Sequence, residues 1–170
     1  MKTFALVVML LVTGGGAVAA TSDMPKRKSG LWEITVSSDG AKGGQTMQQC
    51  IDEKSDDLMK NNMAGTEKQS CSKNEFRREG AKLITESVCK MSGSTATTRG
   101  IFTGQFDSGY KADIKSTYEP PLHGMKESAS TMEAKWLGAC KPGQKPGDIS
   151  IPGMPNININ DMMKNLPKRP

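Results

Sequence analysis

The chain has one histidine and two tryptophans, and none of its four cysteines stands in Cys-x-x-Cys spacing. A catalytic triad and most zinc sites need histidine or closely spaced cysteines. Neither a glycine-rich phosphate loop nor a nucleophile elbow is found. The few aromatic residues are not interleaved with basic ones, so nucleic-acid binding is not expected. These absences predict a protein that is not an enzyme and carries no cofactor.

The first 20 residues have the composition of a signal peptide. Lys2 precedes an apolar run over residues 4–12, and Ala17-Val18-Ala19-Ala20 offers small residues for cleavage. The apolar run is shorter than the ~20 residues that a membrane span needs, and no second such run follows. We therefore expect cleavage near Ala19-Ala20, no membrane span, and a protein that is periplasmic or secreted.

The cysteines predict a disulfide framework. In an oxidising compartment the four cysteines, which can pair in three ways, are expected to form two bridges. The favoured pairing joins Cys71 to Cys89 across a hairpin that turns near Glu79-Gly80, and joins Cys50 to Cys140. The pairing of Cys50 with Cys71 and of Cys89 with Cys140 remains open.

Alternation of apolar and polar residues dominates the middle of the chain. Between residues 110 and 118, Tyr110, Ala112, Ile114 and Tyr118 alternate with charged or polar residues. Such alternation is typical of half-buried antiparallel strands. Turn-forming pairs divide the chain into about seven strands, near 30–38, 45–51, 69–78, 82–90, 94–106, 110–119 and 126–137. The expected fold is mainly β, an antiparallel meander that forms a curled sheet or an incomplete barrel.

One helix and a tail complete the predicted organisation. Residues 52–63 are expected to form the one short helix, with Asp56-Asp57 in a solvated first turn. Residues 141–170 contain six of the nine prolines and are expected to form a flexible tail, in which Asn160 caps a short turn. The predicted domains are thus a signal peptide (1–20), a disulfide-stapled β domain (21–140) and a Pro/Gly-rich tail (141–170).

Several short motifs of the chain resemble a known family. They are Lys28-Ser29-Gly30-Leu31-Trp32-Glu33-Ile34, Gln49-Cys50-Ile51, Cys71, Cys89 and Leu137-Gly138-Ala139-Cys140. Together they are similar to a family of exported proteobacterial proteins known as domain of unknown function 3617. The resemblance covers roughly residues 25–141. It implies an exported domain with four cysteines and assigns no catalytic residue.

Two binding roles compete for this fold. The first is a structural or protein-interaction module of the envelope, which binds an unknown protein through a sheet face or its basic ends. The second is a lipocalin-like carrier of a small apolar or amphipathic ligand. A carrier would line its hollow with Trp32, Tyr118, Met132 and Trp136, although both tryptophans fit better as core anchors.

A third hypothesis is a Cu(I) site. The chain has twelve methionines, and thioether sulfur is a soft ligand that suits Cu(I). His123 and Met125, together with a methionine of the tail, are the candidate ligands. Against this, methionine commonly fills irregular cores. The basic ends, which include Lys26-Arg27-Lys28, are expected to be solvated, and weak contact with anionic surfaces is a further expectation.

Overall fold

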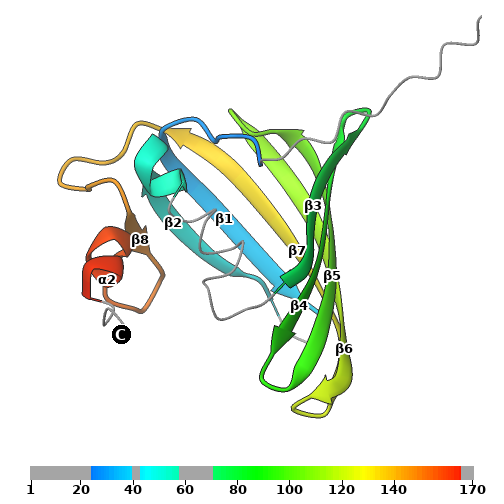
Figure 1. The fold of residues 1–170 in the computed structure, drawn as a ribbon. Coiled ribbons are helices and arrows are strands. Elements are labelled where there is room, and N and C mark those ends of the chain that lie inside the picture. The colour runs from blue at the N-terminus through cyan, green and yellow to red at the C-terminus, as the bar shows by residue number, and fades with distance from the viewer. Residues whose placement is uncertain (1–23, 40–42, 58–70, 166–170) are drawn as a thin grey trace, which may run out of the picture.

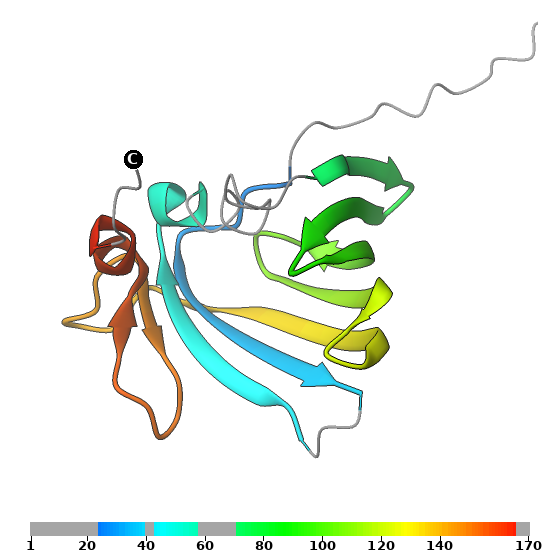
Figure 2. The same cartoon turned by 60° about the horizontal axis from the view of Figure 1, so that its bottom comes forward.

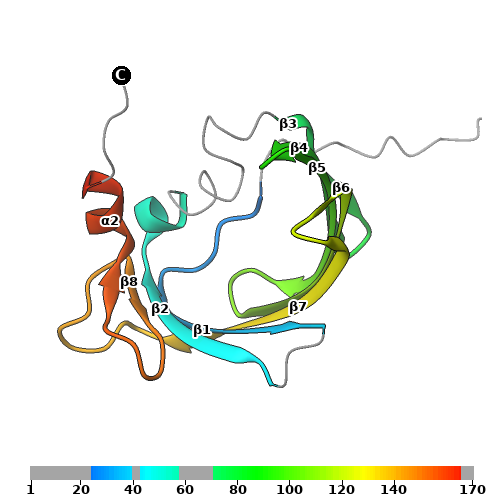
Figure 3. The same cartoon turned by 90° about the horizontal axis from the view of Figure 1, so that it is seen from below.

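The computed structural model describes residues 24–39, 43–57 and 71–165, which form one curled antiparallel sheet with two short helices (Figure 1). The order of the nine strands is β3-β4-β5-β6-β7-β1-β2-β8-β9. Since β3 and β9 lie at the two edges and do not pair, the sheet is open rather than a closed barrel. Figure 3 shows it from below as a C-shaped trough. The predicted fold class is confirmed.

All seven predicted strands are present. They are β1 (Gly30–Ser38), β2 (Gln45–Ile51), β3 (Cys71–Glu79), β4 (Lys82–Met91), β5 (Ser94–Gln105), β6 (Gly109–Leu122) and β7 (Met125–Gly138). Strands β3 to β7 form a meander, because short turns bring each strand back beside the preceding one. The first strand, β1, then closes onto β7, so that the N-terminal hairpin β1–β2 extends the sheet.

Two of the tight turns show why the chain reverses where the sequence predicts. Ser92-Gly93 joins β4 to β5, and His123-Gly124 joins β6 to β7. All four residues have positive φ angles, between 48° and 83°. Two consecutive residues of positive φ form the hairpin turn that matches the right-handed twist of the strands, and glycine favours it. His123 therefore serves as a turn residue.

The structure adds three elements after Cys140 to those predicted. They are β8 (Asp148–Ser150), β9 (Ile157–Asn158) and α2 (Ile159–Asn165). Strand β8 pairs with β2, where Ile149 lies opposite Gln49. The cap of α2 is Asn158 rather than the predicted Asn160, since Asn158 Oδ1 accepts hydrogen bonds from the backbone N–H groups of Asn160 and Asp161, at 2.9 and 3.3 Å.

Both disulfides of the favoured pairing are present. Cys71 and Cys89 lie opposite each other on β3 and β4, and their bridge spans the first hairpin of the meander. Cys50 on β2 is joined to Cys140, which follows the end of β7. The second bridge links segments 90 residues apart and ties β2 to the chain after β7 across the intervening β1.

The concave face of the trough holds the core. Its buried residues are Trp32, Ile34, Ile51, Leu83, Phe102, Tyr110, Ala112 and Ala134. The strand register places them towards the end of the trough where β1 begins and β2 ends. Residues 24–29 run across this end on the concave side (Figures 2 and 3). The alternation seen in the sequence is thus confirmed, with apolar residues inside and charged residues outside.

The predicted helix begins as expected. Residues 53–57 are helical, and its continuation to residue 63 lies outside the described residues. Asp52 Oδ1 accepts a hydrogen bond from the backbone N–H of Ser55, and Ser55 Oγ accepts one from the N–H of Asp52. This reciprocal cap fixes the first turn. Among the described residues, no helix has the length and apolar character needed to cross a membrane.

A candidate ligand pocket on the concave face

A pocket of about 290 Å³ opens on the concave face, next to the core. Strands β1, β2 and β7 form its floor, and residues 24–27 and the helical turn 53–57 form one wall. Its lining residues are Met24, Pro25, Arg27, Ile34, Val36, Met47, Gln49, Asp56, Phe106, Tyr110, Met132 and Ile149. Most of them are apolar, and the volume lies just below the usual range for small-molecule sites, which begins at about 300 Å³. The geometry suits a small apolar group.

Residues 24–29, which we call the covering segment, are held by hydrogen bonds to the sheet. The indole N–H of Trp32 donates to the carbonyl of Lys28 at 2.7 Å, and that of Trp136 donates to the carbonyl of Ser29 at 3.2 Å. The backbone N–H of Lys28 donates to the carbonyl of Phe106. These bonds give hydrogen-bond partners to backbone groups of the covering segment that packing against the core shields from water. The pocket wall is therefore part of the folded domain.

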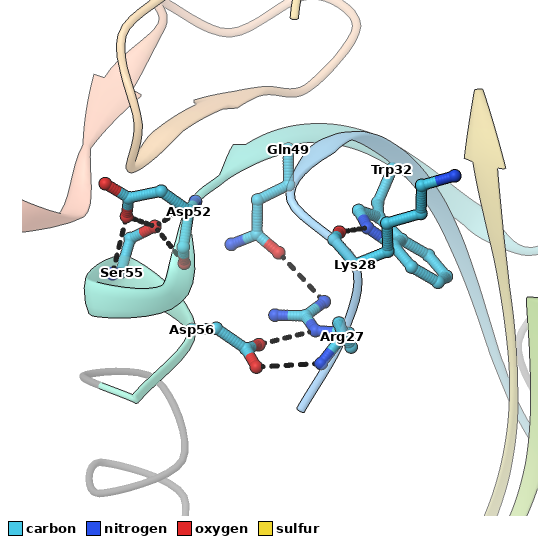
Figure 4. Close-up of polar contacts among 7 residues, drawn as sticks. All are labelled: Arg27, Lys28, Trp32, Gln49, Asp52, Ser55 and Asp56. Carbon is cyan, nitrogen blue, oxygen red and sulfur yellow. Dashed lines mark hydrogen bonds and ion pairs between the residues drawn. The ribbon is translucent and has the colours of Figure 1, made fainter. Parts of the chain in front are cut away.

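A buried ion pair lies at the polar end of the pocket (Figure 4). Arg27 Nε lies 2.7 Å from Asp56 Oδ1, and the backbone N–H of Arg27 donates to Asp56 Oδ2 at 3.1 Å. The side chains of Arg27 and Asp56 are 10% and 2% exposed. Arg27 Nη1 also donates to Gln49 Oε1 at 3.4 Å. The pair joins the covering segment to the helical turn, and its two charges cancel.

Two titratable groups in and near the pocket have shifted pKa values, for different reasons. Burial raises the pKa of the Tyr110 phenol, so this side chain stays neutral at physiological pH. Hydrogen bonds from the backbone and side chain of Ser55 lower the pKa of the Asp52 carboxyl, which caps the helical turn. The pocket thus contains neutral groups and one compensated pair of charges.

The structure separates the four residues predicted to line a hollow. Met132 lines the pocket, whereas Trp32 is fully buried in the core beside it. Trp136 holds the covering segment, with Lys28 Nζ 3.7 Å from its ring centroid. Tyr118 lies towards the other end of the trough, where its hydroxyl is 3.1 Å from that of Ser128. A role of these four residues in binding stays a prediction, and only Met132 is placed at this pocket.

The residues proposed for copper are not gathered with the tail. His123 is exposed in the turn between β6 and β7, and Met125 is 45% exposed on the strand that follows. Met162 lies on α2, and Figures 1 and 3 show this helix and the β6–β7 hairpin on opposite sides of the fold. Within the described residues, no three side chains of His, Cys, Asp or Glu are grouped as a metal site.

Sequence reasoning missed the buried ion pair. Both Arg27 and Asp56 were expected in solvated segments, and the structure corrects this for both side chains. Each residue stands in a charged stretch of the sequence, which normally indicates an exposed surface. The two partners lie 29 residues apart in the sequence, and their opposite charges compensate each other in the buried site. No local pattern marks such a pair.

The chain matches the family model described as a protein of unknown function, DUF3617, over residues 27–140. The chain belongs to the DUF3617 family. No match was found among curated proteins, and none among solved structures.

The boundaries of the DUF3617 match enclose most of the pocket. The match begins at Arg27 and ends at Cys140, so it includes the buried ion pair and both disulfides. Ile149, contributed by β8, lies beyond the match and adds a wall from the C-terminal segment. The pocket is therefore formed mainly by the DUF3617 domain and completed by Met24 and Pro25 before it and by Ile149 after it.

Proposed function

We propose that the chain is an exported, non-enzymatic envelope protein that binds a small apolar or amphipathic ligand in the concave pocket. The observation that carries this proposal is the pocket itself, which is lined mainly by apolar side chains and lies beside a filled core. Open and closed antiparallel β folds commonly place small-ligand sites on their concave side.

Binding rather than catalysis is proposed because of the groups that line the pocket. Among the residues that the structure describes, the lining contains no histidine, cysteine, serine or lysine, and its one carboxylate is paired with Arg27. Nucleophilic and general-base chemistry needs such groups within reach of each other. Of the described lining residues outside this pair, Tyr110 is the titratable one, and burial raises the pKa of its phenol further above neutral pH.

Export is supported by two features. The first 20 residues have the pattern of a signal peptide, and both disulfides require an oxidising compartment to persist. We therefore propose that the mature protein works in the periplasm or is secreted.

A direct test is native mass spectrometry of the protein purified from the periplasm, compared with its mass after denaturation. We expect a mass excess that denaturation removes and that organic solvent extracts as an apolar compound. An excess that matches copper would favour the methionine hypothesis instead. A bare protein that also fails to bind an added apolar probe would contradict ligand binding and favour a protein-interaction role.

The added probe is the neutral dye N-phenyl-1-naphthylamine, whose fluorescence rises in apolar sites. Met132→Lys places a charge in the pocket and is expected to weaken dye binding at least tenfold. The matched control is Thr131→Lys, which introduces the same charge at the neighbouring, exposed position on the convex face. Equal dye binding by the two variants would show that the dye does not occupy the pocket.

A further inference from the structure

Charge is distributed very unequally between the two faces of the trough. Among the described residues, the paired positions of β1, β2, β4, β5, β6 and β7 that share the concave face with Trp32 and Tyr110 include no Asp, Glu, Lys or Arg. The same strands carry their other charges on the convex face, at Glu33, Lys82, Glu86, Lys90, Arg99, Lys111, Asp113, Lys115, Glu119, Glu127, Glu133 and Lys135; the exception is Lys126, which lies on β7 next to the β6–β7 turn, where the register shifts. Around the pocket, the concave face formed by these six strands therefore carries no charged side chain, whereas the edge strand β3 places Arg78 on the same side, opposite Leu83.

Hydroxyl groups replace apolar side chains as the trough leaves the pocket. Beyond Met132 the concave face presents Ser130 and then a cluster formed by Thr98, Ser116, Tyr118 and Ser128. All four residues of this hydroxyl cluster are half-buried. Met132 and Ser128 are four residues apart on β7, so the cluster begins about 13 Å from the pocket at ~3.3 Å per residue.

The hydroxyl cluster retains capacity for further hydrogen bonds. Thr98 and Ser116 share one hydrogen bond of 2.9 Å, and Tyr118 and Ser128 share one of 3.1 Å. A hydroxyl offers one donor and two acceptor sites, so each pair keeps one donor and several acceptor sites after its mutual bond. Such groups recognise hydroxyl and carbonyl oxygens, and they do not compensate a full charge.

The charges at the pocket itself also disfavour an ionic ligand. Arg27 and Asp56 neutralise each other, and both are buried. A carboxylate placed beside Arg27 would meet the negative charge of Asp56, and an ammonium beside Asp56 would meet Arg27. Moving an uncompensated charge into such a site costs several kcal/mol. The uncharged surroundings of the pocket and the Arg27–Asp56 ion pair therefore both favour an uncharged ligand over an ionic one.

We infer that the ligand is an uncharged amphiphile, whose apolar chain occupies the pocket and whose hydroxyl-bearing head group contacts the hydroxyl cluster. This inference rests on the proposed function and specifies its ligand. The ligand spans the trough from Met132 to Ser128, with its apolar part towards the core and its polar part towards the β6–β7 hairpin.

The test of charge selection uses three probes with the same chain length and different head groups. They are 1-decanoylglycerol, which is neutral, decanoate, which is anionic, and decyltrimethylammonium, which is cationic. Isothermal titration calorimetry on the full mature chain, below the micelle concentrations, is expected to give at least tenfold tighter binding of 1-decanoylglycerol. Equal or tighter binding of either ion would overturn the inference and leave the proposed function standing. Failure of every probe, the neutral dye included, would overturn both.

The test of head-group placement removes one hydroxyl at a time. Thr98→Val keeps the shape of the side chain and is expected to weaken 1-decanoylglycerol binding about fivefold, the equivalent of one net hydrogen bond of about 1 kcal/mol. Thr97→Val makes the same change on the convex face and is expected to leave binding unchanged. Ser128→Ala provides a second variant if Thr98→Val is poorly folded. Unchanged binding in a folded concave variant would overturn the placement of the head group.

Discussion

Replacing Arg27 by methionine removes the charge that compensates Asp56 and keeps a side chain of similar length. The Asp56 carboxylate is 2% exposed, so water cannot replace the lost partner. Breaking a buried ion pair typically costs 3–5 kcal/mol. Asp56 keeps its hydrogen bond from the backbone N–H of residue 27, which is 3.1 Å long and does not depend on the side chain. We therefore expect the lower end of the range, a loss of about 3 kcal/mol in the free energy of unfolding.

Urea denaturation followed by circular dichroism measures this loss, and the Tm should fall by about 6–12 °C. The control is the double variant Arg27→Met/Asp56→Leu, which removes both charges. Because buried ion pairs contribute little net stability against apolar replacements, the double variant should recover to within about 1 kcal/mol of the wild type. A single variant that loses less than 1 kcal/mol, or a double variant as unstable as the single one, would refute the reasoning.

Three further predictions concern other parts of the sheet. Hydrogen bonds from Lys73, and then from Arg77, lower the pKa of the Glu86 carboxyl to about 2. Because the folded-state pKa is below its usual value of 4.5, this stabilisation is present above pH 4.5 and lost as the pH falls towards 2; Lys73→Met should raise the pKa in a carbon-13 NMR titration, and an unchanged value would contradict the contact. Replacing both cysteines of the Cys50–Cys140 disulfide by alanine should cost about 4.5 kcal/mol in urea denaturation, because the bridge closes a loop of about 90 residues; a loss below 1 kcal/mol would exclude this role. Gly30→Ala should cost about 2 kcal/mol, because Gly30 has φ of 133° and a Cβ there would lie 2.2 Å from a carbonyl oxygen of β7; an unchanged Tm would show that the strand can shift.

The sequence allowed the strands to be predicted almost residue by residue. The bounds of β1 and β2 agree with the expectation, and those of the other five strands differ by a few residues at most. The reason is that apolar–polar alternation and turn-forming residues are local signals. A window of about ten residues is therefore enough to predict a strand and the face that each of its side chains occupies. The disulfide pairing followed because Cys71 and Cys89 lie on either side of one predicted hairpin.

The candidate site was much less accessible from the sequence. Met132 was the one residue of the predicted hollow that lines the pocket, since alternation shows which face a side chain occupies and not how far along the trough the core extends. Trp32 and Tyr118 are on the same face, yet the covering segment packs over the end of the trough that contains Trp32 and not over the end that contains Tyr118. That packing depends on contacts between segments distant in the sequence.

The sequence by itself determined the strands, their inner and outer faces and the cysteine framework. Each of these follows from short-range periodicity or from residue type. Tertiary structure alone decided that Arg27 and Asp56 are buried together, that the covering segment forms a pocket wall, and that β8 extends the sheet beyond Cys140. These features join residues that are far apart in the chain, and their stability comes from mutual burial, which no local pattern encodes.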